Sequence, residues 1–179
     1  MIIDKKDLIL SVINNTPLRK GKITDEEFLR KFLNGPANIN EAISRELNNS
    51  LVTKDPVSLE LAMYLGFHFE FSENDVNTLA SLMTENWHEK HADVLRALVG
   101  LKSHSSEVVD AIYHCAITDF DYLEDDREDG IFTLASDCIY ALAKIGTPCA
   151  IDKLKLLMES RWEEVREQVD NVMRNYDLK

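Results

Sequence analysis

The feature that most constrains this chain is a helix, corner, helix pattern that recurs along it. In ALAKIGTPCAIDKLKLLM (141–158), Gly146 predicts the end of one helix. Thr147 and Pro148 then predict the N-cap and first position of the next helix. DVLRALVGLKSHSSEVVDAIYHCA (93–116) has the same order of apolar helix, polar corner and apolar helix. The two stretches therefore indicate one repeated structural unit.

Weaker copies extend the pattern in both directions. One lies at 59–83, and a half-copy occupies 163–173. A period of about 35–45 residues is typical of arrays in which each helix pair buries its apolar face against the next. Residues 1–50 hold three amphipathic helices outside the repeat, and we interpret them as a divergent cap over the end of the array. Because no clean alternating strand pattern occurs, we predict an all-α chain of about ten helices.

The clearest copy, 137–173, resembles HEAT-type repeats, in particular the short HEAT-like repeats named after phycobilisome lyases. That family has a helix ending in A-L-x-x-I-G, a Pro-Ala-Ile corner and an acidic-Val-Arg start of the next repeat. The similarity is moderate over 88–116, weak over 56–85 and absent before residue 50. It implies a HEAT-like α-solenoid of stacked antiparallel helix pairs, with the second helix of each pair lining a concave side. The matching residues are Ala141, Leu142, Ile145, Gly146, Pro148, Ala150, Ile151, Leu154, Leu157, Val165 and Arg166.

Domain organisation and location follow from the same patterns. We expect residues 1–179 to form a single domain, with 1–50 as the cap and 55–179 as the HEAT-like repeats. No apolar run reaches the roughly 20 residues needed to span a bilayer, and the charged start MIIDKKDLIL is unlike a signal peptide. The three cysteines lie in apolar helical patterns, which favours reduced thiols and a cytoplasmic protein.

The net charge of −12 is concentrated in the middle of the chain. Residues 55–129 hold 17 Asp and Glu against 4 Lys and Arg, whereas the segments 1–50 and 130–179 are nearly balanced. Binding to nucleic acid needs Lys and Arg to neutralise phosphates, so this composition predicts no nucleic-acid partner. It favours a basic protein partner instead. The alternative is that the acidic residues serve only solubility.

The histidines in WHEKH suggest a zinc site, but the pattern is incomplete. His88 and His91 are three residues apart, whereas a zinc-binding helix face places its histidines four apart. His114 and Cys115 on a neighbouring helix are the remaining candidate ligands. Iron-binding HEAT-like enzymes such as deoxyhypusine hydroxylase carry several His-Glu dipeptides, and this chain has one. We therefore expect no metal, and we interpret the histidines as a solvent-exposed corner before a helix.

Other catalytic signatures are also incomplete. The six glycines are scattered at helix ends rather than gathered in a phosphate-binding loop, and no G-x-S-x-G motif is present. Carboxylates abound, but a catalytic pair needs a pocket that separates its two pKa values. We therefore predict that the chain is not an enzyme and has no cofactor.

The most unusual stretch is DFDYLEDDREDG (119–130), which has seven acidic residues in twelve. It fails as an EF-hand, because aligning its glycine places Arg127 and Ser136 at ligand positions. A long connection between repeats is often functional, so we interpret it as a partner-binding loop. The alternative is a solvated connection whose aromatic side chains only pin it to the core. With two residues of an earlier corner, the expected contact residues are Asp119, Phe120, Asp121, Tyr122, Glu124, Asp125, Asp126, Glu128, Asp129, Trp87 and Glu85.

Together these features predict a non-enzymatic acidic protein that inhibits a basic partner. Acidic side chains can mimic phosphate spacing, which suits the active site of a nuclease. Small acidic α-solenoids of this size resemble immunity proteins that neutralise bacterial toxin domains, and the resemblance implies an antitoxin that blocks the active site of a toxin. Phe120, Tyr122 and Trp87 are the expected anchors. The alternative is a general adaptor that holds a peptide or helix in the concave groove, and a lyase-like or modifying enzyme is a weaker third possibility.

Overall fold

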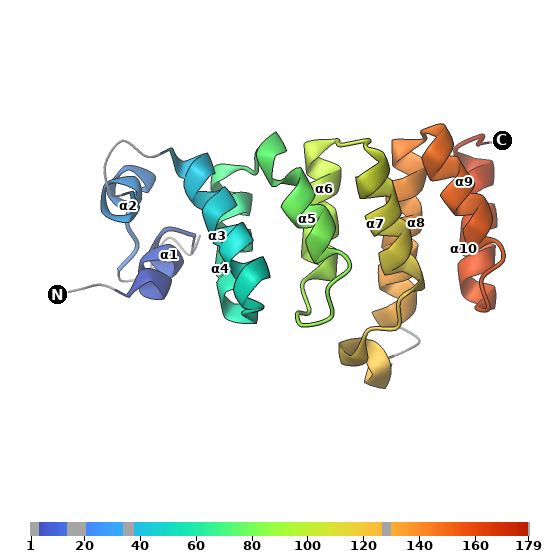
Figure 1. Cartoon of the computed structure of the whole chain (residues 1–179), viewed down its shortest axis with the longest axis horizontal. Helices are drawn as coiled ribbons and strands as arrows, with labels where there is room; N and C mark the ends of the chain where they lie inside the picture. Colours follow the sequence, from blue (N-terminus) through green and yellow to red (C-terminus); the bar gives the residue numbers. More distant parts are fainter. Residues whose placement is uncertain (1–3, 14–20, 34–37, 127–129, 179) are drawn as a thin grey trace. The chain divides into compact units, whose positions relative to one another are not determined.

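The structure is a computed structural model of the chain, and it describes residues 4–13, 21–33, 38–126 and 130–178. All regular secondary structure in these residues is helical, with ten α-helices and two short 3₁₀ helices (Figure 1). The prediction of an all-helical chain is therefore confirmed. None of the helices described is long and apolar enough to cross a lipid bilayer.

The chain divides into two compact units, Met1–Asp75 and Val76–Lys179. The sequence places the boundary between the cap and the repeats near residue 50, where the repeat pattern begins. In the structure, the boundary between the two compact units falls after Asp75. The helix that the sequence assigns to the first weak repeat therefore packs with the N-terminal helices. Whether the two units form the single domain expected from the sequence stays a prediction.

The first unit contains four α-helices and a short 3₁₀ turn. Helix α3 packs along α4, and α1 contacts both α2 and α4 (Figure 1). The largest fully buried side chains at its centre include Phe28, Ile43, Leu47, Leu59 and Leu65. The elements are α1 (Lys5–Ile13), α2 (Asp25–Phe32), α3 (Ile39–Thr53), α4 (Pro56–Phe69) and η1 (Glu73–Asp75).

Helix α3 extends further than its polar sequence suggests. The run Asn48-Asn49-Ser50 predicts its end, but the helix continues to Thr53. The Asn48 side chain donates to the Ser44 carbonyl, and the Ser50 hydroxyl donates to the Leu47 carbonyl. These side chains are thus satisfied by the carbonyls of their own helix and do not interrupt it.

The sequence predicts that α4 begins after an N-cap at Asp55 and ends near Gly66; the structure confirms the start and places the end later. The Asp55 carboxylate accepts from the amides of Val57 and Ser58, which confirms it as the N-cap. The sequence places the helix end at Gly66, but this glycine lies in the helix interior. A Cβ at Gly66 would lie 2.0 Å from the Phe71 ring, so the glycine makes room for a side chain and does not end the helix.

The second unit contains two rows of helices. Helices α5, α7 and α9 contact one another in sequence, and so do α6, α8 and α10 (Figure 1). The rows meet through contacts between α5 and α6, α7 and α8, and α9 and α10. The elements are α5 (Val76–Leu82), α6 (His91–Leu101), α7 (Ser106–Ile117), η2 (Asp121–Asp126), α8 (Phe132–Ile145), α9 (Pro148–Leu157) and α10 (Glu163–Asn175).

The corner between α8 and α9 forms as the sequence predicts. Gly146 has φ 61°, in the left-handed region, and ends α8. The Thr147 hydroxyl accepts from the Ala150 amide at 3.3 Å, and Pro148 is the first residue of α9. Ser105 caps α7 in the same way. These N-caps and the helix stop are local signals, and the structure confirms them.

The predicted core faces of the second unit are largely confirmed. The buried side chains include Val94 and Leu98 of α6, Ile112 of α7, Leu142 of α8 and Val169 of α10. Two expectations from the apolar spacing, that Met158 faces the core and that a helix begins at His88, are wrong. Met158 is 42% exposed, because α9 ends at the preceding residue. Helix α6 begins at His91 and not at His88.

Candidate partner-binding surface

The start of the acidic stretch is held against the second unit by its two aromatic side chains. Phe120 is 2% exposed, and the centroid of its ring lies 3.8 Å from that of His91. Tyr122 is half-buried, and its hydroxyl lies 3.0 Å from His91 Nδ1. Helix η2, which contains Tyr122, projects beyond the neighbouring ends of α7 and α8 (Figure 1). The aromatic residues thus fix the base of a projecting segment.

His91 is fully buried and neutral. Its Nε2 lies 2.8 Å from the Glu85 carbonyl oxygen, which can only accept, so Nε2 carries the proton. The bare Nδ1 then accepts from the Tyr122 hydroxyl. Burial, with a further contribution from the neighbouring His88, lowers the pKa of His91 to about 4. The ring is therefore a structural link between the α5–α6 connection and the acidic stretch.

His88 is 2% exposed, and both of its ring nitrogens are also hydrogen-bonded. Its Nε2 donates to the Leu82 carbonyl at 3.0 Å, and its Nδ1 accepts from the Lys90 amide at 3.1 Å. The rings of His88 and His91 stack with centroids 4.4 Å apart. Burial also lowers the pKa of His88. The prediction that these histidines form a solvent-exposed corner is therefore wrong, because the loop after α7 covers His91.

The other candidate metal ligands do not join the two histidines. His114 is exposed and lines the groove between α5 and α7, whereas Cys115 is buried. A hydrogen bond with the Cys115 thiol, together with burial, raises the pKa of Cys138, and burial raises the pKa of Tyr122. Cys138 and Tyr122 therefore stay uncharged at neutral pH. Among the described residues, no three His, Cys, Asp or Glu side chains lie where they could hold a metal ion.

The charged side chains at the start of the stretch face solvent. Asp119 and Asp121 are exposed, and Asp119 forms an ion pair with Arg161. The backbone of Glu124, Asp125 and Asp126 belongs to η2, and their side chains lie outside the described part of the structure. Glu128 and Asp129 lie outside the described residues altogether.

The remaining expected contact residues lie in the α5–α6 connection. Trp87 is half-buried, with its ring edge-on to that of His88 and the centroids 4.8 Å apart. Its Nε1 is buried and has no hydrogen-bond acceptor among the described residues. Glu85 is partly exposed and accepts from His91 through its carbonyl. The structure thus places Trp87 and Glu85 beside the base of the acidic stretch.

The exposure of the apolar side chains around the loop differs from the expected one. Phe120 is buried and supports the loop, so its ring cannot reach a partner in this fold. Ile117, at the end of α7, is 49% exposed and immediately precedes the loop. The sequence gives no sign of this, because an isoleucine at the end of an amphipathic helix normally faces the core.

A polar groove lies between α5 and α7 in the same unit. It has a volume of about 580 Å³, and Glu107 and Asp110 contribute its carboxylates. The amide of Glu107 itself and the hydroxyls of Ser105 and Ser106 lower the pKa of the Glu107 carboxyl, which is therefore ionised at neutral pH. Asp110 pairs with Lys153 at 2.6 Å. The groove is therefore a second acidic feature of the unit.

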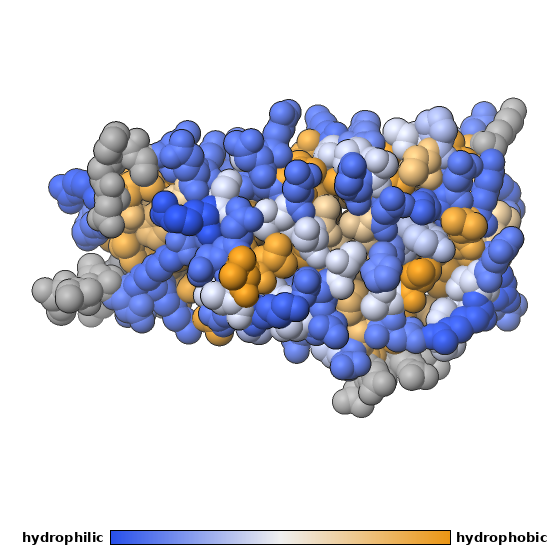
Figure 2. Space-filling view, in the orientation of Figure 1, coloured by the Kyte–Doolittle hydropathy of each residue, from blue (hydrophilic) through white to orange (hydrophobic). Residues whose placement is uncertain are grey.

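The described surface is mostly hydrophilic on the face shown in Figure 2, with small separate apolar patches. Comparisons with protein-family models, with curated proteins and with solved structures found no match to this chain. The functional argument therefore depends on the geometry and charge of the chain itself.

Proposed function

We propose that this chain is a HEAT-like α-solenoid that binds and inhibits a basic protein, and that its partner is a toxin domain such as a nuclease. The contacts within each helix row of the second unit support the solenoid assignment, as does the resemblance of residues 137–173 to HEAT-like repeats. The distribution of acidic side chains supports a basic partner. The inhibitor would cover the active site of the toxin and exclude its anionic substrate.

The observation that carries the proposal is the fixed base of the acidic stretch. Phe120 and Tyr122 pack inward on His91, while Asp119 and Asp121 face solvent. Carboxylates on a pre-formed loop lose less conformational entropy on binding than carboxylates on a disordered one. Between residues 76 and 126 the chain has ten Asp and Glu against three Lys and Arg. The negative electrostatic potential of this excess of carboxylates speeds the encounter with a cationic surface and disfavours anionic surfaces.

Apolar contacts would supply the slow dissociation that charge alone does not. Ile117 is exposed at one side of the loop, and Tyr122 is partly accessible within it. Trp87 contributes a partly exposed ring from the α5–α6 connection. The proposed interface is thus an apolar group bordered by carboxylates, and it replaces Phe120 with Ile117 as an anchor.

The chemistry of His88, His91 and Cys138 supports a binding role over a catalytic one. The ring nitrogens of His88 and His91 are all hydrogen-bonded, and both rings are neutral. The Cys138 thiol has a raised pKa, which makes it a poor nucleophile at neutral pH. These groups are built into the core and stabilise the loop.

The test is an affinity capture followed by a rescue assay. The tagged chain is used to recover proteins from extracts of its native cells, and the recovered protein is identified by mass spectrometry. We expect one basic protein whose expression arrests growth and whose activity the chain inhibits. Capture of an acidic protein, or of a large assembly that shows no toxicity, would contradict the proposal.

A variant pair localises the contact. Asp119→Lys with Asp121→Lys reverses two charges on the loop, and Glu159→Lys with Glu167→Lys makes the same charge change around α9 and α10. The loop variant should lose capture of the partner, whereas the control variant should keep it. Equal capture by both variants would remove the loop from the interface.

One observation favours the adaptor as a second candidate. The groove between α5 and α7 lies between the second helices of two predicted repeats, where HEAT-like proteins would hold a peptide. Its carboxylates, from Glu107 and Asp110, would suit a basic segment. Glu107→Lys would then abolish capture while the loop variant binds normally, which distinguishes the two functions.

A further inference from the structure

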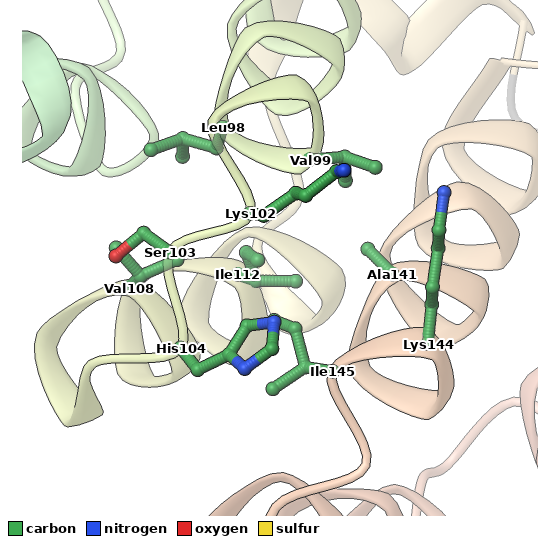
Figure 3. Close-up of a pocket in the computed structure, with 10 residues that line it drawn as sticks. All are labelled: Leu98, Val99, Lys102, Ser103, His104, Val108, Ile112, Ala141, Lys144 and Ile145. Carbon is green, nitrogen blue, oxygen red and sulfur yellow. The ribbon is translucent and has the colours of Figure 1, made fainter. Parts of the chain in front are cut away.

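A small apolar pocket lies among α6, α7 and α8, within the second unit (Figure 3). Its volume is about 160 Å³. An engineered apolar cavity of about 150 Å³ in another protein binds benzene, so this space fits one aromatic ring or a branched aliphatic group of similar size. The apolar side chains that line it are Leu98, Val99, Val108, Ile112, Ala141 and Ile145.

Two lysines and a histidine border this pocket from two elements. Lys102 and His104 belong to the turn between α6 and α7, and Lys144 belongs to the last turn of α8. Figure 3 shows the Lys102 and Lys144 side chains on different elements, with both ammonium groups toward the same end of the pocket. All three residues are exposed, and the two lysines carry the positive charge.

The two lysines differ from several other cations of the unit. Arg96, Lys153 and Arg161 each pair with a carboxylate, at Asp93, Asp110 and Asp119 respectively. Within the described part of the chain, neither Lys102 nor Lys144 forms an ion pair. Their positive charge is therefore available to an anion, next to an apolar space, in a chain with net charge −12.

We propose that this pocket binds a small carboxylate that carries one aryl or branched alkyl group. The apolar group enters between Ile112 and Ala141, and the carboxylate lies at the rim, where Lys102 and Lys144 donate to it. Neither an apolar neutral molecule nor a bare anion satisfies both parts of the site. The pocket is lined by residues other than those of the acidic stretch, so this site stands or falls independently of the partner-binding proposal.

The direct test uses benzoate and its neutral analogue, benzyl alcohol, with the full chain carrying ¹³C-labelled methyl groups. Titration with benzoate should give saturable shifts confined to methyls that line the pocket, such as those of Leu98, Val108 and Ile112. Benzyl alcohol should bind about tenfold more weakly, because it lacks the charge that the two lysines recognise. Equal binding of both probes, shifts elsewhere, or no saturation with benzoate would overturn the proposal.

Variants separate the two parts of the site. Lys102→Gln with Lys144→Gln should weaken benzoate binding about tenfold and leave benzyl alcohol unchanged. Lys155→Gln removes an exposed lysine of α9 outside the pocket and should change neither affinity. Ala141→Leu fills the pocket and should abolish the binding of both benzoate and benzyl alcohol. If Ala141→Leu fails to fold, as judged by circular dichroism, the lysine variant decides the question, and its unchanged affinity for benzoate would refute the site.

Discussion

Acidification below pH 7 should destabilise this protein through its buried histidines. His91 and His88 are buried as neutral rings, and burial lowers the pKa of both. The unfolded chain therefore binds more protons than the folded one at pH values between the folded and the unfolded pKa. The contribution of these neutral histidines to the free energy of unfolding is fully present above the histidine pKa of the unfolded chain. It is lost as the pH falls toward the histidine pKa of the folded chain.

The size of this loss follows from the pKa of His91. The value is about 4 in the folded chain and 6.5 without perturbation. Linkage between these values gives a loss of about 2 kcal/mol of unfolding free energy between pH 7 and pH 5. His88 adds to the loss in the same direction, because a protonated Nδ1 would face the Lys90 amide, and two donors would oppose each other.

Urea unfolding at pH 7, 6 and 5, followed by tryptophan fluorescence, measures the loss. His91→Gln should flatten the pH dependence, because it removes the shifted group. His104→Gln, at an exposed position, should keep the full wild-type dependence. The lowered pKa values of Glu27, Asp55 and Glu107 act mainly below this pH window. A loss below about 0.5 kcal/mol, or an unchanged slope in His91→Gln, would refute the reasoning.

Further predictions concern packing, helix propensity and the accessibility of the cysteine thiols. Leu142→Ala should cost about 2–5 kcal/mol in urea unfolding because the side chain is fully buried, and a loss below about half a kcal/mol would show that this face is not the core. Gly66→Ala should destabilise by about 1–3 kcal/mol as its Cβ displaces the Phe71 ring. By contrast, Gly100→Ala, with open space around it, should stabilise by about 0.5–1 kcal/mol. Of the three cysteines only Cys149 is not buried, so Ellman's reagent should titrate one thiol in native protein and three in denaturant, and a second fast native thiol would contradict this burial.

The sequence predicts the helices and their corners well, because the signals are local. The hydroxyl of Thr147, the ring of Pro148 and the left-handed Gly146 act within one turn of the residues they organise. Apolar spacing likewise predicts buried faces such as that of α7. The end of α3 shows the limit of local signals. The run Asn48-Asn49-Ser50 predicts a helix end, but the side chains of Asn48 and Ser50 hydrogen-bond to carbonyls of their own helix, which continues.

The candidate site is less predictable, because it depends on long-range contacts. His91 and Tyr122 are 31 residues apart and meet only when the loop after α7 folds back on the α5–α6 connection. That contact decides that Phe120 points inward and that the histidines are buried, and no local pattern specifies it. The sequence shows that the stretch is rich in carboxylates. Tertiary packing decides which of its side chains support the loop and which face solvent.

The most direct test of the central claim is the salt dependence of the complex between this chain and the protein it captures. A basic partner bound by the acidic stretch should show a Kd that rises steeply between about 0.05 and 0.5 M salt, because exposed charges are screened over this range. Asp119→Lys with Asp121→Lys should weaken the complex at low salt and reduce that dependence. A Kd insensitive to both salt and charge reversal would contradict a partner recognised by its positive charge.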